Sequence, residues 1–188
     1  MSTKQRVRII AGKWRSRLLT FPEVDGLRPT GDRIRETVFN WLAPTIGGAR
    51  CLDLFSGSGA LCFEALSRGA RDCLALEQNS QALTALNQNK ALLDASALTI
   101  KRADTLTYLS DSPDQPFDIV FVDPPFQANL LTQVCALLEQ NHWLKDGSLI
   151  YCELSSRHNQ LLAPANWRVE RSKTAGEVSY ILYSRIEP

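Results

Sequence analysis

The sequence predicts an α/β protein whose sheet is mostly parallel. From residue 49 onward, short apolar runs alternate with amphipathic stretches of helical length, which is typical of strands joined by crossover helices. The run 117–122 is almost continuously apolar, as expected of a strand that is covered on both faces. Segments 167–170 and 178–183 alternate apolar and polar residues, and they indicate an antiparallel pair that closes the sheet.

The same patterns place the other elements of this sheet. We expect further strands at 51–55, 73–76, 98–101 and 148–152, and helices from 61 to a stop at Gly69, at about 80–93, at 130–140 and near 159–162. Ser80 is the expected N-cap of the helix at 80–93, because a serine hydroxyl can accept a hydrogen bond from a free N–H of the first turn.

A hairpin and a helix are expected ahead of the sheet. Residues 7–10 and 17–21 flank a turn at 11–13, and apolar residues at helical spacing predict a helix over 32–42. A length of 188 residues suits one sizeable core with a small appendage. We therefore divide the chain into a basic N-terminal hairpin extension, 1–30, and a main α/β domain, 31–188.

The charge of the chain is unevenly distributed. The first forty residues hold nine Lys and Arg against four Asp and Glu, a net charge of +5, whereas the whole chain carries only +1. A basic arm on a mildly acidic body suggests a polyanionic partner. A solvated charged face is an equally good explanation of the charge alone.

The composition of the chain indicates its cellular compartment, the state of its cysteines and whether it binds a metal. No apolar run approaches the roughly 20 residues of a membrane helix, and the basic start has no apolar stretch behind it, so we expect a cytoplasmic protein without membrane contact. The five cysteines lack any Cys-x-x-Cys spacing and lie mostly in apolar segments, which favours reduced core residues. With only two histidines and no clustering, no metal site is expected.

A glycine-bearing loop lies where the first strand of the sheet meets its helix. The segment 53–59 reads Asp-Leu-Phe-Ser-Gly-Ser-Gly, and open α/β sheets bind ligands at this crevice. Gly57 and Gly59 would let a ligand approach the backbone, with Phe55 and Ser56 beside it. The third glycine of the dinucleotide pattern G-x-G-x-x-G is missing, since Cys62 stands there.

Three acidic residues follow three successive strands. Asp53 precedes the loop, Glu77 ends the second strand at the spacing of a ribose-binding carboxylate, and Asp104 follows the third. A carboxylate beside the loop would repel a pyrophosphate. The set fits a ligand with a ribose, an exocyclic amine and a positive charge but no phosphate, which is S-adenosylmethionine. Asp104 alone is nearly as well explained as a helix N-cap.

The segment Asp-Pro-Pro-Phe at 123–126 directly follows the fourth strand. Its two prolines form a rigid turn that lacks two N–H donors, so its free groups are mainly acceptors. Asp123 and the Pro124 carbonyl would hold the two protons of an exocyclic base amine and stabilise developing positive charge. Phe126 would stack on the base, for about 1–3 kcal/mol. Alternatively, the prolines only end a strand and Phe126 packs in the core.

Together, the 53–59 loop, Glu77 and the 123–126 turn resemble the Rossmann-like class I methyltransferases that act on amino nitrogens. Two further segments, Arg-Ile-Ile-Ala-Gly-Lys-Trp-Arg at 8–15 and Arg-Pro-Thr with Asp-Arg-Ile-Arg-Glu at 28–36, resemble a narrower family. That family is the bacterial 16S ribosomal RNA guanine-N2 methyltransferases. The resemblance extends over nearly the whole chain.

The resemblance implies methyl transfer from S-adenosylmethionine, with S-adenosylhomocysteine as product, to the 2-amino group of one guanine in 16S rRNA or the small subunit, by a monomer. It implies that the cofactor site comprises Asp53, Phe55, Ser56, Gly57, Gly59, Glu77 and Asp104, and that the catalytic residues are Asp123, Pro124 and Phe126. It implies RNA contacts from Arg6, Arg8, Lys13, Arg15, Arg17, Arg28 and Arg33, with Trp14 anchoring the hairpin. Segment 28–36 either lies over the cofactor or contacts RNA.

Other functions remain open at this point. The turn cannot separate guanine from adenine or cytosine, so an adenine amino-methyltransferase acting on RNA or DNA is the first alternative. An NAD-dependent oxidoreductase would share the fold, although the missing glycine and the Pro-Pro turn oppose it. A non-catalytic RNA-binding protein would be expected to have lost the acidic residues Asp53 and Glu77, and both are present.

Overall fold

The computed structural model describes residues 4–24, 29–125, 128–156 and 163–187. The strands are β1 (Lys4–Arg8), β2 (Leu18–Pro22), β3 (Arg50–Asp53), β4 (Asp72–Glu77), β5 (Leu98–Arg102), β6 (Phe117–Val122), β7 (Leu144–Ser155), β8 (Trp167–Ala175) and β9 (Val178–Arg185). The helices are α1 (Asp32–Leu42), α2 (Ala60–Ser67), α3 (Ser80–Leu92), α4 (Thr105–Leu109) and α5 (Ala128–Gln140).

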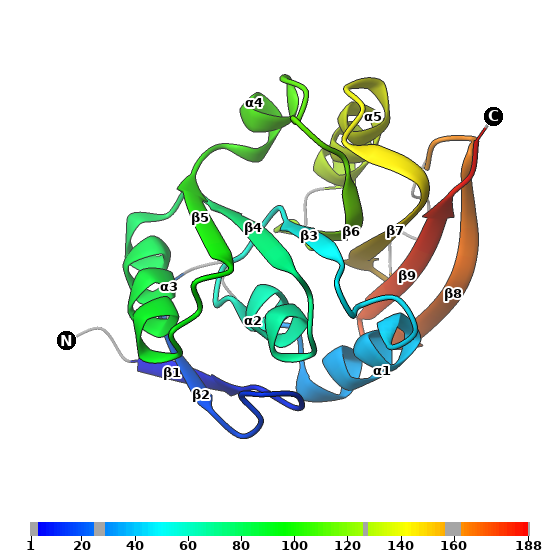
Figure 1. Ribbon diagram of the computed structural model, residues 1–188. Coiled ribbons are helices and arrows are strands. Elements are labelled where there is room, and N and C mark those ends of the chain that lie inside the picture. The colour runs from blue at the N-terminus through cyan, green and yellow to red at the C-terminus, as the bar shows by residue number, and fades with distance from the viewer. Residues whose placement is uncertain (1–3, 25–28, 126–127, 157–162, 188) are drawn as a thin grey trace.

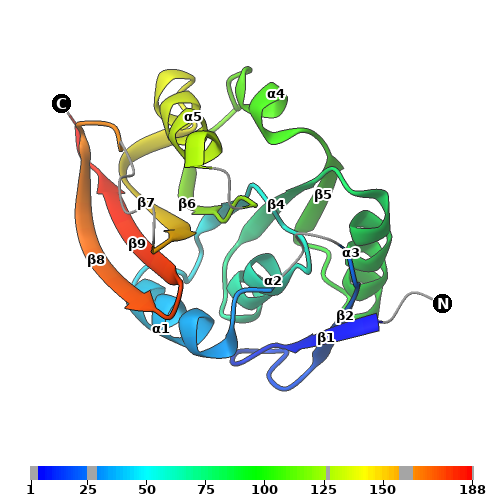
Figure 2. The ribbon, with the colours of Figure 1, turned by 180° about the vertical axis from the view of Figure 1, so that it is seen from behind.

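The main sheet confirms the predicted mostly parallel architecture. Its strand order is β5-β4-β3-β6-β7-β9-β8 within the described residues. Strands β3 to β7 run parallel, and β9 lies antiparallel to both β7 and β8. Helices α1, α2 and α3 lie on one side of the sheet, and α4 and α5 lie on the other (Figures 1 and 2).

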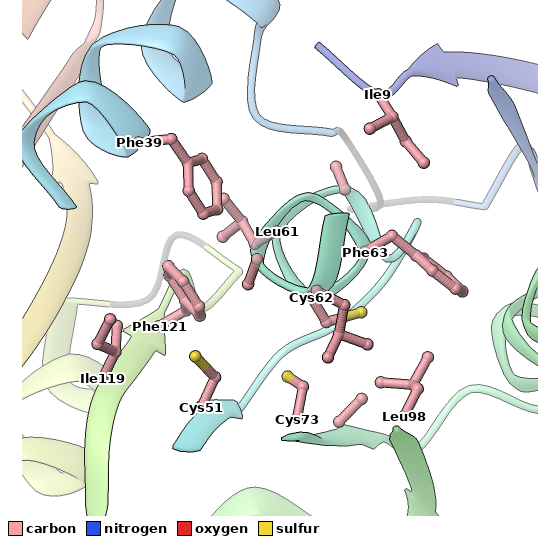
Figure 3. Close-up of a cluster of buried hydrophobic side chains, with 14 of the residues drawn as sticks. Ile9, Phe39, Cys51, Leu61, Cys62, Phe63, Cys73, Leu98, Ile119 and Phe121 are labelled. Atoms are coloured by element: carbon pink, nitrogen blue, oxygen red, sulfur yellow. The ribbon is translucent and has the colours of Figure 1, made fainter. Parts of the chain in front are cut away.

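Each face of the sheet packs against its own apolar core. Because successive side chains of a strand point to opposite faces, Cys51 joins the core under α1 to α3, and Leu52 joins the core under α5. Figure 3 shows the first core, in which Phe63 of α2, Phe39 of α1 and Phe121 of β6 gather around the helix. All five cysteines are free and buried, as the sequence predicts.

The N-terminal hairpin differs from the prediction in its turn. Strands β1 and β2 pair antiparallel with Val7 opposite Leu19, and the connection runs from residue 9 to 17 instead of a tight turn at 11–13. The connection is long because it docks on α2. The Lys13 N–H donates to the Ser67 carbonyl at 2.8 Å, and a Cβ on Gly12 (φ +84°) would lie 1.9 Å from that oxygen.

Three details of the helices and strands were predicted wrongly or not at all. Asn79, and not Ser80, caps α3, since its side chain accepts from the N–H groups of Gln81 and Ala82. Helix α4 was missed because it is only 5 residues long. Strands β7 and β8 extend well beyond their predicted ranges, and β8 and β9 form the predicted antiparallel pair. The predicted helix near 159–162 lies outside the described residues.

Two features are absent from the described part of the chain. No helix there is long and apolar enough to span a membrane. No group of three or more His, Cys, Asp or Glu side chains there is arranged to hold a metal ion.

Candidate active site

A cleft of about 930 Å³ opens at the carboxyl ends of the parallel strands. The loops after β3, β4, β5 and β6 line it, together with the end of β7 and the segment ahead of α1. It brings together predicted site residues from distant parts of the sequence: Phe55, Ser56, Gly57, Glu77, Asp104, Asp123 and Pro124. The topology explains this gathering, since parallel strands end at the same edge of the sheet.

The glycine loop is held by Glu77. One carboxylate oxygen, Oε2, accepts from the Gly57 N–H at 2.9 Å, and the other accepts from the N–H groups of Gln78 and Asn79 at 2.8 and 2.7 Å. Two of the predicted cofactor residues, Asp53 and Gly59, are not among the residues that line the cleft, and Gly59 is the left-handed N-cap of α2. A Cβ at Gly59 would lie 2.7 Å from side-chain atoms of Phe63 and Leu86, so packing requires the glycine.

Asp53 is buried at the base of this loop, with 2% of its surface exposed. Its Oδ2 atom has no hydrogen-bond partner among the described residues. Burial raises the pKa of Asp53 to about 7, and the charge of Glu77 adds to the rise, whereas backbone N–H groups of Phe55 and Cys62 oppose it. A buried acceptor without a partner is costly unless a ligand supplies a donor or a positive charge. Asp53 and the cleft therefore fit an amino-bearing cationic ligand.

Asp104 combines a place at the cleft with the helix N-cap that the sequence offered as its alternative role. It lines the cleft, and it is the N-cap of α4. Its Oδ1 accepts from the N–H and the hydroxyl of Thr107 at 2.9 and 2.8 Å. The side chain is exposed, and both hydrogen bonds use Oδ1. Among the described residues, Oδ2 has no donor, so it can accept an N–H from a ligand.

The turn after β6 places Asp123 in the same cleft. Asp123 is half-buried, Pro124 is buried, and Phe126 lies outside the described residues. The Thr30 hydroxyl donates to Asp123 Oδ2 at 3.3 Å. Burial raises the pKa of Asp123 well above its usual range, and the charge of Glu153 raises it further. Asp123 thus faces a second acidic group, and the hydrogen bond from Thr30 only partly offsets the rise in the pKa of Asp123.

That second group, Glu153, was not predicted as a site residue. It lies near the end of β7, lines the cleft and is 5% exposed. The Tyr151 hydroxyl donates to its Oε1 at 2.5 Å, and both Tyr151 and the nearby Thr30 side chain counter the rise that burial causes in the pKa of Glu153. The signal in the sequence was a glutamate directly after the apolar run 148–152, at the strand end where Asp53 and Glu77 also occur.

Part of segment 29–36 borders the cleft. The sequence predicts that this segment lies either over the cofactor or against RNA. Pro29, Thr30, Gly31 and Ile34 line the cleft. Arg35 is fully buried, and its Nε donates to the Thr30 carbonyl at 3.0 Å. The position of Thr30 is therefore fixed from the side opposite its hydroxyl.

The predicted RNA-binding residues lie mainly on the surface. The exposed ones are Arg6, Arg8, Lys13, Arg15, Arg17 and Arg33, and Arg28 lies outside the described residues. Trp14 is 8% exposed and packs edge-on against Phe63 with 6.3 Å between ring centroids, as expected of an anchor. The Lys13 Nζ lies 4.1 Å from the centre of the Trp14 ring.

Comparison with known proteins identifies the family. Residues 7–184 match the family described as "Conserved hypothetical protein 95". The chain belongs to this family. It is 47% identical over 180 residues to "Ribosomal RNA small subunit methyltransferase D" of Escherichia coli (strain K12), covering 96% of this chain and 90% of that protein. It is 46% identical over 185 residues to the protein of the same name from Haemophilus influenzae, covering 97% and 95%.

Solved structures give the family its fold. "Putative methyltransferase yhhF from Escherichia coli" superposes with a TM-score of 0.91 and 43% identity, over 98% of this chain and all of that one. "Putative methylase HI0767 from Haemophilus influenzae" gives a TM-score of 0.84 and 42% identity, over 97% and 100%. These matches confirm the resemblance to methyltransferases and the Rossmann-like sheet that the sequence predicted.

Proposed function

We propose that this member of the family transfers a methyl group from S-adenosylmethionine to the exocyclic 2-amino group of a guanine in 16S rRNA. One observation carries the proposal: the acceptor turn at Asp123 lines the same cleft as loop residues 54–58 and Glu77. The names of the relatives support the reaction class and the ribosomal RNA substrate. A ribosomal RNA substrate implies action in the bacterial cytoplasm.

The cofactor would be held by the loop and the acidic residues around it. When bound, S-adenosylmethionine supplies an electrophilic methyl group on a positively charged sulfur. Asp53 offers a buried acceptor without a partner, Glu77 keeps the loop in shape while bordering the cleft, and Asp104 retains one oxygen for an N–H donor. Phe55 and Ser56 would complete the site, and Gly59 would act through the shape of α2.

The turn would prepare the amine. The lone pair of an exocyclic base amine is delocalised into the ring, so the nitrogen is a weak nucleophile. The Asp123 carboxylate and the Pro124 carbonyl would accept its two N–H bonds and orient the nitrogen, and both acceptors stabilise the positive charge that develops on it. Stacking of Phe126 on the base remains part of the proposal, as do phosphate contacts by the basic arm, including Arg28 and Arg33.

Product analysis tests this function. The purified protein is incubated with methyl-labelled S-adenosylmethionine and either free 16S rRNA or purified small subunits that lack the modification, and the RNA is digested to nucleosides. We expect label in N2-methylguanosine. Label in a methyladenosine would overturn the base assignment and favour the adenine alternative.

Calorimetry separates the enzyme classes. We expect S-adenosylmethionine to bind and NAD not to bind. Binding of NAD alone would support an oxidoreductase, and binding of neither would support a non-catalytic RNA-binding protein.

A further inference from the structure

The turn at 123–126 recognises an amine, but nothing in it distinguishes guanine from adenine or cytosine. We propose that Glu153 supplies the missing distinction by accepting the N1–H of guanine while Asp123 holds the 2-amino group. This inference rests on the proposed function, and it assigns a specificity-determining residue to the same site.

The geometry presents Glu153 to the substrate side. Tyr151 is fully buried and occupies Oε1 of Glu153 through the 2.5 Å hydrogen bond, so that oxygen is fixed. Tyr151 is itself held against Phe121, with 6.3 Å between ring centroids. Because Glu153 lines the cleft, its remaining lone pairs are available to a ligand there.

Donors are scarce around the two carboxylates. Thr30 has one hydroxyl proton, which it donates to Asp123, so Glu153 has the Tyr151 hydroxyl as its side-chain donor among the described residues. In the described part of the chain, neither carboxylate forms an ion pair with a lysine or arginine. Two neighbouring acceptors at the cleft, with so few donors among the described residues, are matched by a ligand edge that carries several N–H groups.

Guanine has such an edge, and the other amine-bearing bases do not. Guanine presents N1–H directly beside its 2-amino group, so its donors are adjacent. Adenine presents the N1 lone pair beside its 6-amino group, and cytosine presents the N3 lone pair beside its 4-amino group. A carboxylate next to the amine site would meet a lone pair in either case. The position of Glu153 therefore favours guanine and opposes adenine and cytosine.

Discrimination requires Glu153 to be ionised when the base is bound, because a protonated carboxyl could donate to a ring lone pair. Burial raises the pKa of Glu153, and burial together with the Glu153 charge raises the pKa of Asp123. The free site thus retains a proton more readily than two exposed carboxyls would. The N–H groups of guanine replace that proton as donors, so binding of the base favours ionisation of both groups.

Base analogues at the target position test the contact atom by atom. 2,6-Diaminopurine and 2-aminopurine keep the 2-amino group of guanine but have a lone pair at N1, and they differ from each other at C6. We expect the wild-type protein to methylate RNA carrying guanine roughly tenfold or more faster, in kcat/KM, than RNA carrying either analogue. Equal rates for guanine and both analogues would overturn the inference, without needing any variant.

The variant Glu153→Gln then assigns the preference to this residue. Its amide can donate to N1, so we expect the ratio of guanine to analogue rates to fall by about tenfold, with the affinity for S-adenosylmethionine unchanged. In Tyr151→Phe the carboxylate remains, so the rate should fall while guanine stays preferred. An unchanged ratio in Glu153→Gln would refute the role of Glu153. If the wild-type protein made no N2-methylguanosine, the proposed function itself would fail.

Discussion

Two groups of buried carboxylates in this protein differ in what surrounds them. Glu64 of α2 is fully buried, and it is paired with Arg35 at 3.4 Å and with Arg68 at 2.7 Å. It also accepts the N–H groups of Ile10 and Ala11 at 2.8 and 3.0 Å. By contrast, Asp53 and the pair of Asp123 and Glu153 in the cleft have raised pKa values and no ion pair with a cation in the described residues.

The difference separates structure from function. The Glu64 group joins the hairpin connection, α1 and α2, and its acceptors are fully used, so it has nothing left to offer a ligand. The cleft acids keep unused acceptors at a cost in stability, which is typical of groups that await a substrate. Thr30 links the two regions, since its carbonyl accepts from Arg35 and its hydroxyl donates to Asp123.

Removing the charge of Glu64 should produce the largest loss of stability. In Glu64→Gln, the fully buried Arg35 loses its buried countercharge and keeps only the exposed Asp32, and Arg68 loses its partner as well. We expect the free energy of unfolding to fall by about 3–5 kcal/mol. Urea titration followed by circular dichroism measures it. Asp72→Asn, which breaks the exposed contact with Arg71, is the control and should unfold near the wild-type midpoint. A Glu64→Gln protein as stable as the wild type would show that the ion pairs of Glu64 do not stabilise the fold.

Asp53→Asn should act in the opposite direction and depend on pH. The folded pKa of about 7 exceeds the ordinary aspartate pKa of 3.8, so the folded state binds the proton more tightly and loses stability as pH rises from about 4 to 7. The variant removes this loss. At pH 8 we expect it to be more stable than the wild type by on the order of 4 kcal/mol, and equally stable at pH 4. Equal pH slopes in urea titrations of the two proteins would contradict the raised pKa.

Thr30→Val tests the link between the regions. The valine keeps the shape and the backbone carbonyl that Arg35 holds, but it removes the hydroxyl that donates to Asp123 beside Glu153. We expect stability to change by only about 1–2 kcal/mol, because one hydrogen bond is lost, while kcat falls roughly tenfold. Thr37→Val, a matched change at an exposed hydroxyl on α1, should leave both unchanged. Unaltered kcat in Thr30→Val would mean that Thr30 does not position the acids.

We expect the smallest effect from substitutions in the basic arm, which should change RNA binding and not stability. Arg15 and Arg17 are exposed, so replacing both with alanine should leave stability unchanged, weaken RNA binding and reduce the salt slope of the binding constant by about one per lost phosphate contact. The double change Arg171→Ala with Lys173→Ala removes the same charge from β8 and is the control. A salt slope equal to that of the wild type would show that Arg15 and Arg17 do not contact RNA phosphates.

The sequence predicted the sheet well because its strands are apolar runs with local boundaries. It also predicted that Asp53, Glu77, Asp104 and Asp123 share one edge, since parallel strands end together. It missed Thr30 and Glu153, because their role depends on which distant segments meet at the cleft. It also missed the docking of residues 10–14 on α2, where Glu64 sits in an apolar helix without any sign of its partners. These relations are tertiary, and neither spacing nor periodicity encodes them.

Methyl transfer by Asp123→Ala tests most directly whether the Asp123 carboxylate holds the amine that receives the methyl group. The variant and the control Asp111→Ala, an exposed aspartate that does not line the cleft, are assayed with labelled S-adenosylmethionine and the RNA substrate at saturation. We predict that Asp123→Ala loses at least about 10²–10³-fold in kcat. Its affinity for S-adenosylmethionine should equal that of the wild type. Full methyl transfer by Asp123→Ala would contradict the account.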